Sequence, residues 1–147
     1  MAENGRGSAG VPGIVLVSHS REVAESVARL AIALAGGAGN VRVVPTGGDP
    51  DGGIGTDAES ITDAARRADA GAGVAVLVDL GSAVLTVRSL VADGEEEIGD
   101  EGLPPGTRLL DAPFLEGAVA AVVAAAGGAD LEGVTEAAGE ARDYRKR

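Results

Sequence analysis

Two short runs of the sequence consist only of apolar residues, and they restrict the possible folds more than any other feature. They occupy residues 14–17 (IVLV) and 74–78 (VAVLV). A strand that is covered on both faces has no reason to alternate with polar residues, so we predict that both runs are central strands of a sheet. Covered sheets of this kind contain mostly parallel strands, which need crossover helices between them.

Amphipathic segments alternate with these runs, as the crossovers require. We predict helices at about 21–35, from 56, 82–91, 115–126 and 130–142, and two further strands at 41–44 and 107–110. Helix-capping residues begin four of these helices: Ser20, Thr56, Ser82 and Asp130. The residues predicted to face inward are Val23, Val27, Leu30, Ala31 and Leu34 in the first helix, and Ile61, Ala64, Ala65 and Ala68 in the second.

Strands that alternate with helices indicate an α/β fold built from βαβ units with right-handed crossovers. We predict a mostly parallel four-stranded sheet of order 2-1-3-4, with helices on both faces. That order reverses between the first and third strands, and a crevice opens at the carboxyl ends of two such strands. The functional site is therefore expected where these two strands end.

The 147 residues suffice for one domain, which we place at 13–142, between a flexible tail (1–12) and a basic tail (143–147). We predict that the acidic stretch 93–106 is a solvated loop. The net charge of −11 argues against nucleic acid and anionic membranes as partners, because both attract basic surfaces. No apolar run reaches the ~18 residues of a membrane span, and we expect a cytoplasmic protein.

His19 and Asp79 follow the first and third strands, so both lie at the predicted crevice. His19 is the only histidine, and an imidazole can exchange protons or phosphoryl groups near neutral pH. If Asp79 accepts a hydrogen bond from Nδ1–H of His19, Nε2 keeps a nucleophilic lone pair. We therefore predict that His19 is a catalytic nucleophile and that Asp79 orients it.

Several helix N-termini converge on this crevice and offer backbone N–H groups to an anion. The predicted phosphoryl-binding residues are Ser18, Ser20, Gly55, Thr56, Gly81 and Ser82. Simpler explanations stay open at this point. Ser20, Thr56 and Ser82 are also explained as helix caps, and Asp79 as a turn residue.

The sequence lacks the residues and motifs that several other kinds of functional site require. It contains no cysteine and a single histidine, so a zinc site would need mostly carboxylates. Neither a Walker loop, a G-x-G-x-x-G turn after a strand, nor a G-x-S-x-G elbow occurs. We expect no metal and no cofactor. One alternative is a receiver-like signalling module phosphorylated on Asp79, although receivers need an acidic pair after the first strand, where this chain has Ser18-His19-Ser20.

Four segments carry a family resemblance: GIVLVSHS at 13–20, GIGTD at 53–57, VDLGSA at 78–83 and APFLEG at 112–117. In this order they closely resemble the phosphotransferase subunit of the PTS-dependent dihydroxyacetone kinase. That subunit is related to the mannose-type IIA domain of the sugar phosphotransferase system. The resemblance extends over about residues 13–141.

The resemblance implies a role for each partner and for the two site residues. His19 matches the histidine that accepts a phosphoryl group from the histidine phosphocarrier protein and passes it to ADP on the nucleotide-binding subunit of the kinase. Asp79 matches the aspartate that hydrogen-bonds this histidine. The resemblance also implies a homodimer. The mannose-type branch exchanges an edge strand, whereas residues 129–142 here indicate a helix. The acidic loop, residues 93–102, is longer than expected for the family. A mannose-type sugar transporter IIA domain is the nearest alternative.

Overall fold

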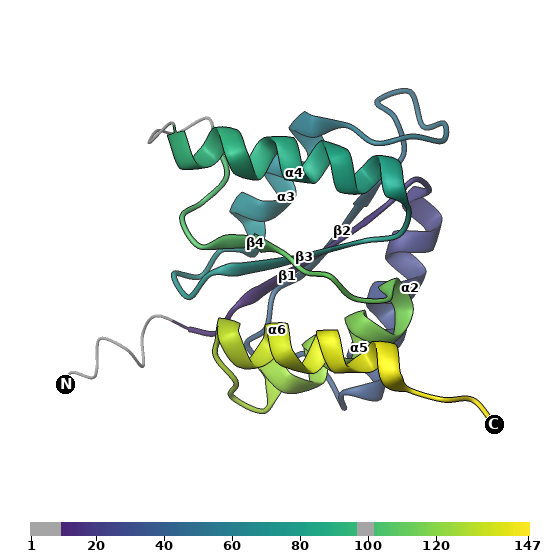
Figure 1. The fold of residues 1–147 in the computed structure, drawn as a ribbon, viewed down its shortest axis with the longest axis vertical. Helices are drawn as coiled ribbons and strands as arrows, with labels where there is room; N and C mark the ends of the chain where they lie inside the picture. The colour runs from purple at the N-terminus through teal and green to yellow at the C-terminus, as the bar shows by residue number, and fades with distance from the viewer. Residues whose placement is uncertain (1–9, 97–101) are drawn as a thin grey trace.

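The predicted α/β architecture is confirmed by the computed structural model, which describes residues 10–96 and 102–147. Four parallel strands form one sheet of order β2-β1-β3-β4 (Figure 1). The strands are β1 (Gly13–Ser18), β2 (Val43–Gly47), β3 (Val74–Val78) and β4 (Thr107–Leu109). The helices are α2 (Arg21–Leu34), α3 (Ala58–Ala68), α4 (Gly81–Glu96), α5 (Phe114–Ala126) and α6 (Leu131–Glu140), followed by a 3-10 turn at Ala141–Asp143.

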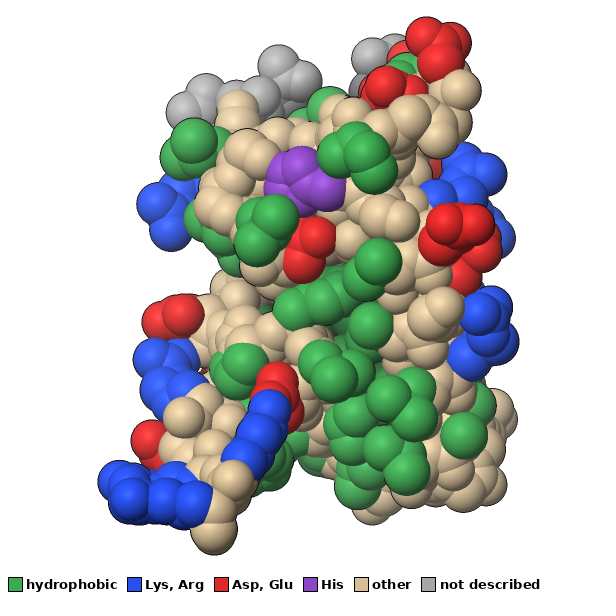
Figure 2. All heavy atoms as spheres, turned by 90° about the vertical axis from the view of Figure 1, so that its right-hand side faces the viewer, with side chains coloured by type: hydrophobic (Ala, Val, Ile, Leu, Met, Phe, Trp, Pro, Cys, Tyr) green, Lys and Arg blue, Asp and Glu red, His purple; other side chains and the backbone are tan. Residues whose placement is uncertain are grey.

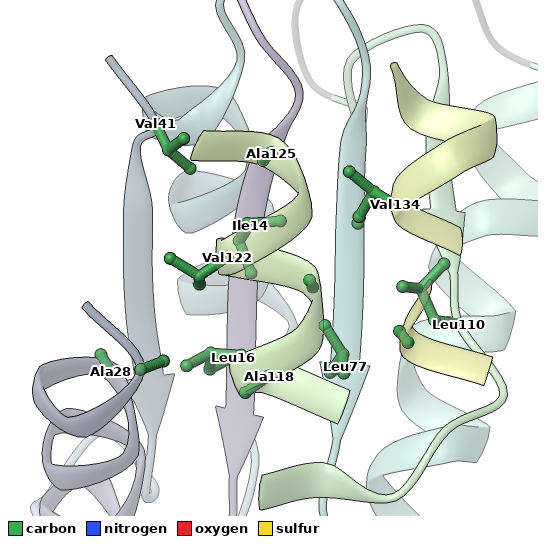
Figure 3. Close-up of a cluster of buried hydrophobic side chains, with 14 residues drawn as sticks. Ile14, Leu16, Ala28, Val41, Leu77, Leu110, Ala118, Val122, Ala125 and Val134 are labelled. Carbon is green, nitrogen blue, oxygen red and sulfur yellow. The ribbon is translucent and has the colours of Figure 1, made fainter. Parts of the chain in front are cut away.

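Helices cover both faces of the sheet, so the central strands are buried on both sides. α3 and α4 lie on one face, and α2, α5 and α6 lie on the other (Figure 1). Along β1 the side chains alternate between the two layers. Ile14 and Leu16 pack with α2, α5 and α6 (Figure 3), whereas Val15 and Val17 pack with α3 and α4. This double burial explains the uninterrupted apolar sequence of β1 and β3.

The predicted inner face of α2 is confirmed at Ala31 and wrong at Val23, Leu30 and Leu34, which are exposed. The helix buries Ala24, Ala28 and Ala31, whereas Leu30 and Leu34 are 44% and 61% exposed. Both sets of residues have helical spacing, so periodicity alone cannot choose between them. The alanines face inward because α2 packs against β1 and α5, where small side chains let the elements approach closely. For α3 the predicted inner face is confirmed, since Ile61, Ala64, Ala65 and Ala68 are all buried.

Several predicted boundaries also differ from the structure. Strand β2 begins and ends later than the predicted 41–44. α3 is capped by Asp57, whose carboxylate accepts the N–H of Ser60 at 3.0 Å, and not by Thr56. The aspartate takes this position because it is the stronger N-cap of the two neighbours. The cap of α6 is as predicted, since the side chain of Asp130 accepts from the N–H of Gly133 at 2.9 Å.

α4 departs most from its prediction. It begins at Gly81, so Ser82 lies inside its first turn and is not its N-cap. It also continues to Glu96, through the first part of the stretch predicted as a loop. The rest of the predicted acidic loop includes residues 97–101, which lie outside the described residues. Within the part of the chain that the structure describes, no helix is both long and apolar enough to cross a membrane.

Gly13 lets β1 pass directly against the end of α3. A Cβ at this position would lie 2.1 Å from the carbonyl oxygen of Ala68 and 2.8 Å from its Cβ. The oxygen belongs to the backbone, so it cannot move aside as the end of a flexible side chain would. Only glycine fits here without a shift of β1 or α3, and that shift would disturb the strand that leads to His19.

We predict that Gly13→Ala lowers the free energy of unfolding by about 1–3 kcal/mol, the usual cost of overpacking. Urea denaturation measures the effect. Gly139→Ala is the control, because a Cβ at Gly139 in α6 meets nothing within 4 Å and alanine favours a helix. Equal stability of the Gly13→Ala variant and the wild type would contradict the close packing of β1 on α3.

Candidate active site

His19 and Asp79 meet at the carboxyl ends of β1 and β3. The two strands are parallel neighbours in which Val17 is opposite Val78, so the residues that follow each strand lie side by side. His19 Nδ1 and Asp79 Oδ1 are 3.0 Å apart. The sheet order therefore brings together the imidazole and the carboxylate that the sequence placed at the crevice.

The carboxylate of Asp79 accepts four hydrogen bonds. Its Oδ2 accepts from the hydroxyl of Ser18 at 2.8 Å and from the backbone N–H of His19 at 3.0 Å. Its Oδ1 accepts from the backbone N–H of Leu80 at 2.7 Å as well as from the ring of His19. Burial raises the pKa of Asp79, but the hydrogen bonds from His19 and Ser18 outweigh it and hold this pKa below its ordinary value. Asp79 is thus a carboxylate near neutral pH, with its geometry fixed.

An ionised Asp79 determines which nitrogen of His19 carries the proton. Because a carboxylate only accepts hydrogen bonds, Nδ1 of the neutral ring must be the donor to Oδ1. Nε2 then keeps its lone pair. This nitrogen lies 2.5 Å from the hydroxyl oxygen of Ser82, which must donate its proton to Nε2. The ring therefore presents a nucleophilic nitrogen with a hydroxyl beside it.

Three of the predicted phosphoryl-binding residues already use their polar groups within the site. The Ser18 hydroxyl donates to Asp79 and accepts from the N–H of Ser20 at 3.0 Å. The Ser20 hydroxyl accepts from Val23 N–H at 3.3 Å as the N-cap of α2. The N–H of Gly55 donates to the carbonyl of His19 at 2.9 Å. These contacts hold the backbone around His19.

The start of α4 provides the groups nearest to Nε2. Gly81 and Ser82 lie in its first turn, where backbone N–H groups have no partner within the helix. The hydroxyl of Thr86 donates to the carbonyl of Ser82 at 3.2 Å. The hydroxyl oxygens of Thr86 and Thr56 lie 3.4 Å apart. The sequence alone does not single out Thr86 as a residue of this site. Its position four residues after Ser82, one helical turn away, was the available signal.

The imidazole of His19 is partly exposed to solvent. The side chain of His19 is 19% exposed, and Figure 2 shows the histidine at the surface with acidic and hydrophobic side chains around it. A groove of about 580 Å³ lies elsewhere, between α2, β2 and α3, with Arg21, Thr46, Ser60 and Arg67 among its lining residues. His19 and Asp79 do not line it. Among the described residues, no group of three or more His, Cys, Asp or Glu side chains is placed to hold a metal ion.

This chain is similar to known proteins in sequence and in fold. A family model described as EIIA-man, PTS system fructose IIA component, matches residues 13–135. The crystal structure of a protein of unknown function, EF1359, superposes with a TM-score of 0.72 at 28% identity, over 93% of this chain and 97% of that one. The same fold therefore exists in a solved structure of nearly the same length.

Curated relatives carry a more specific name, the phosphoryl donor subunit DhaM of PEP-dependent dihydroxyacetone kinase. The protein of Pantoea ananatis is 35% identical over 127 residues, which cover 85% of this chain and 26% of the relative. That of Escherichia coli is 34% identical over 82% of this chain and 25% of the relative. The chain thus spans about a quarter of these two proteins. The kinase 2 subunit of Listeria innocua is 33% identical, over 75% of this chain and 82% of the relative.

The matched model covers all four strands and both residues of the His19–Asp79 pair. On this coverage, and on the identity to the Listeria subunit, the chain belongs to the EIIA-man family of phosphotransferase-system IIA components.

Proposed function

We propose that this chain is a phosphoryl-carrier subunit of a dihydroxyacetone kinase. In this proposal His19 accepts a phosphoryl group from the histidine phosphocarrier protein and passes it to ADP on the nucleotide-binding subunit of the kinase. One observation carries the proposal. The hydrogen bond from Nδ1 to Asp79 leaves Nε2 as an accessible nucleophile at the end of β1. The relatives named DhaM support the kinase as the pathway in preference to sugar transport.

The transfer needs only the ring and its surroundings. Nε2 attacks the phosphorus of the donor's phosphohistidine, a new N–P bond forms, and the electron pair of the broken P–N bond returns to the donor's ring. The proton on Nδ1 stays in place, so the phosphorylated ring of His19 becomes cationic. Asp79, 3.0 Å away, stabilises that positive charge. In the second transfer a terminal phosphate oxygen of ADP attacks the same phosphorus, and His19 becomes neutral again.

Ser82 has a role before and after the first transfer. Its hydroxyl donates to Nε2 in the unphosphorylated chain, so it must turn away before this nitrogen attacks. The same hydroxyl and the first N–H groups of α4 then lie beside the phosphoryl oxygens. Phosphoryl transfer depends mainly on positioning and on stabilisation of charge, and these groups supply both. Asp79 is a poor phosphorylation site itself, since both of its oxygens already accept hydrogen bonds.

We further propose that the chain forms a homodimer through an apolar stripe on α2, defined by Val23, Val27, Leu30 and Leu34. These residues recur at steps of three and four, so they share one side of the helix. α5 packs beside α2 and adds Leu115 and Val123, which are exposed at its own surface. Figure 2 shows a broad hydrophobic area below the histidine on this face. An apolar surface of this breadth favours a permanent partner.

His19→Ala should abolish phosphorylation by the phosphorylated histidine phosphocarrier, because no other residue offers the same nitrogen. Transfer of ³²P followed by gel analysis measures the label. On the wild type the label should be labile in acid and stable in base, as phosphohistidine is. Circular dichroism checks that the variant folds. Undiminished label on His19→Ala would refute the assignment.

Asp79→Asn should slow the phosphorylation of His19 by roughly 10²–10⁴-fold, the size of effect expected when the orienting carboxylate of a histidine is lost. The amide keeps the shape of the side chain but cannot stabilise the cationic ring. Rapid-quench kinetics measure the rate. Asp63→Asn is the matched control, since Asp63 is exposed and forms only a surface pair with Arg67. Equal rates for the two variants would remove Asp79 from the mechanism.

Leu30→Asp should convert the proposed dimer into a monomer, because it places a charge in the middle of the apolar stripe. Sedimentation velocity measures the mass in solution. Arg29→Asp is the control, since Arg29 is exposed on the same helix and lies neither three nor four residues from any member of the stripe. A wild-type chain that is monomeric at micromolar concentration contradicts the proposal.

A further inference from the structure

Three large hydrophobic side chains stand exposed around His19. Ile54 is 75% exposed, Leu85 is 67% exposed and Leu80 is 61% exposed. No large hydrophobic residue in the described part of the chain is more exposed than Ile54 or Leu85. Figure 2 shows hydrophobic side chains on several sides of the histidine. We call these three residues the apolar rim.

The three rim residues come from different segments. Each is held near the site by its own backbone, by the next residue, or by its place on a helix. Leu80 follows Asp79, and its N–H donates to that carboxylate. Ile54 precedes Gly55, whose N–H donates to the carbonyl of His19. Leu85 lies three residues after Ser82 on α4, so it shares the helix face that carries the hydroxyl beside Nε2. The fold therefore holds the rim in a fixed position around the reactive nitrogen.

An exposed apolar rim indicates what kind of molecule brings the phosphoryl group. A site for a free small molecule is concave and encloses most of its ligand. Nε2 instead lies at the surface, and the 580 Å³ groove does not include His19. Exposed hydrophobic residues around a polar centre are typical of a protein interface. The rim thus fits a protein that carries its phosphoryl group on its own surface.

The charges beside the rim indicate which charge the edge of the partner's surface should carry. The loop that ends at Ile54 also carries Asp49 and Asp51, and the whole chain has a net charge of −11. An acidic surface speeds the approach of a basic partner and repels an acidic one. A partner with an apolar patch around its phosphoryl group and basic residues at the edge complements this surface.

We propose that Ile54, Leu80 and Leu85 form the surface on which the phosphoryl-donating protein docks. This inference rests on the proposed function, and it assigns the residues that recognise the donor. The rim residues do not touch the reacting atoms. They bring the donor's phosphoryl group to Nε2 and exclude water from the contact. Loss of the rim therefore reduces transfer from a protein without altering the reactivity of His19.

Two phosphoryl donors separate docking from chemistry. The first is the phosphorylated histidine phosphocarrier protein, which needs a docking surface. The second is phosphoramidate, a small molecule that reaches Nε2 without one. The variants are Ile54→Ser, Leu80→Ser and Leu85→Ser, each alone and all three together. Leu80→Ser keeps the backbone N–H that donates to Asp79. Tyr144→Ser is the matched control, because Tyr144 is 57% exposed and follows the last helical turn, outside both the rim and the apolar stripe of α2.

Each single rim variant should slow transfer from the phosphocarrier protein by about tenfold, which corresponds to about 1.4 kcal/mol of interface energy. The triple variant should slow it further, while labelling by phosphoramidate stays at the wild-type rate. Tyr144→Ser should match the wild type with both donors. Addition of salt should slow the protein reaction and leave the phosphoramidate reaction unchanged.

Three results would overturn the docking proposal. Rim variants that accept the phosphoryl group from the protein at the wild-type rate show that the donor docks elsewhere. Rim variants that lose both reactions show that these residues support the site itself. A wild-type chain that is labelled by phosphoramidate but not by the phosphocarrier protein overturns the proposed function, and the assigned occupant of the rim with it.

Discussion

The hydrogen bond between Asp79 and His19 is the interaction on which the site depends. It fixes the proton on Nδ1, leaves the lone pair on Nε2, and places a negative charge where a phosphorylated ring would be positive. Its geometry does not rest on the two side chains alone. Ser18 and two backbone N–H groups also hold the carboxylate, so the ring has a fixed partner whose own position is determined by the ends of β1 and β3.

The sequence was sufficient to predict the parts of the fold in which every residue of a strand is buried. The apolar runs at 14–17 and 74–78 have no polar face, so a covered parallel sheet is the simplest fold that accommodates both. The sheet order then places His19 and Asp79 at adjacent strand ends. This step needs no knowledge of side-chain packing, because it follows from topology and from the polarity of parallel strands.

The sequence pattern could not predict which side of α2 packs inward or at which residue each helix begins. α2 contains an alanine stripe and a stripe of larger residues, and the sequence cannot state which one faces the sheet. The choice depends on how closely α5 approaches, which is a property of the assembled layers. The sequence predicts Ser82 as a cap because serine caps many helices. α4 instead begins one residue earlier, and that small shift turns the hydroxyl from the backbone toward Nε2.

The composition of the core explains why so much apolar surface remains outside. Inner helix positions are largely alanine, as at Ala28, Ala64 and Ala121, and this lets two layers of helices pack closely on a small sheet. Larger side chains such as Leu34 and Leu85 are consequently free to occupy the surface, where they add little to the stability of the isolated chain. Exposing these side chains to water is unfavourable in free energy, and this is offset only when another surface covers them. In the proposed carrier role this division is an advantage, because folding and docking then depend on different residues.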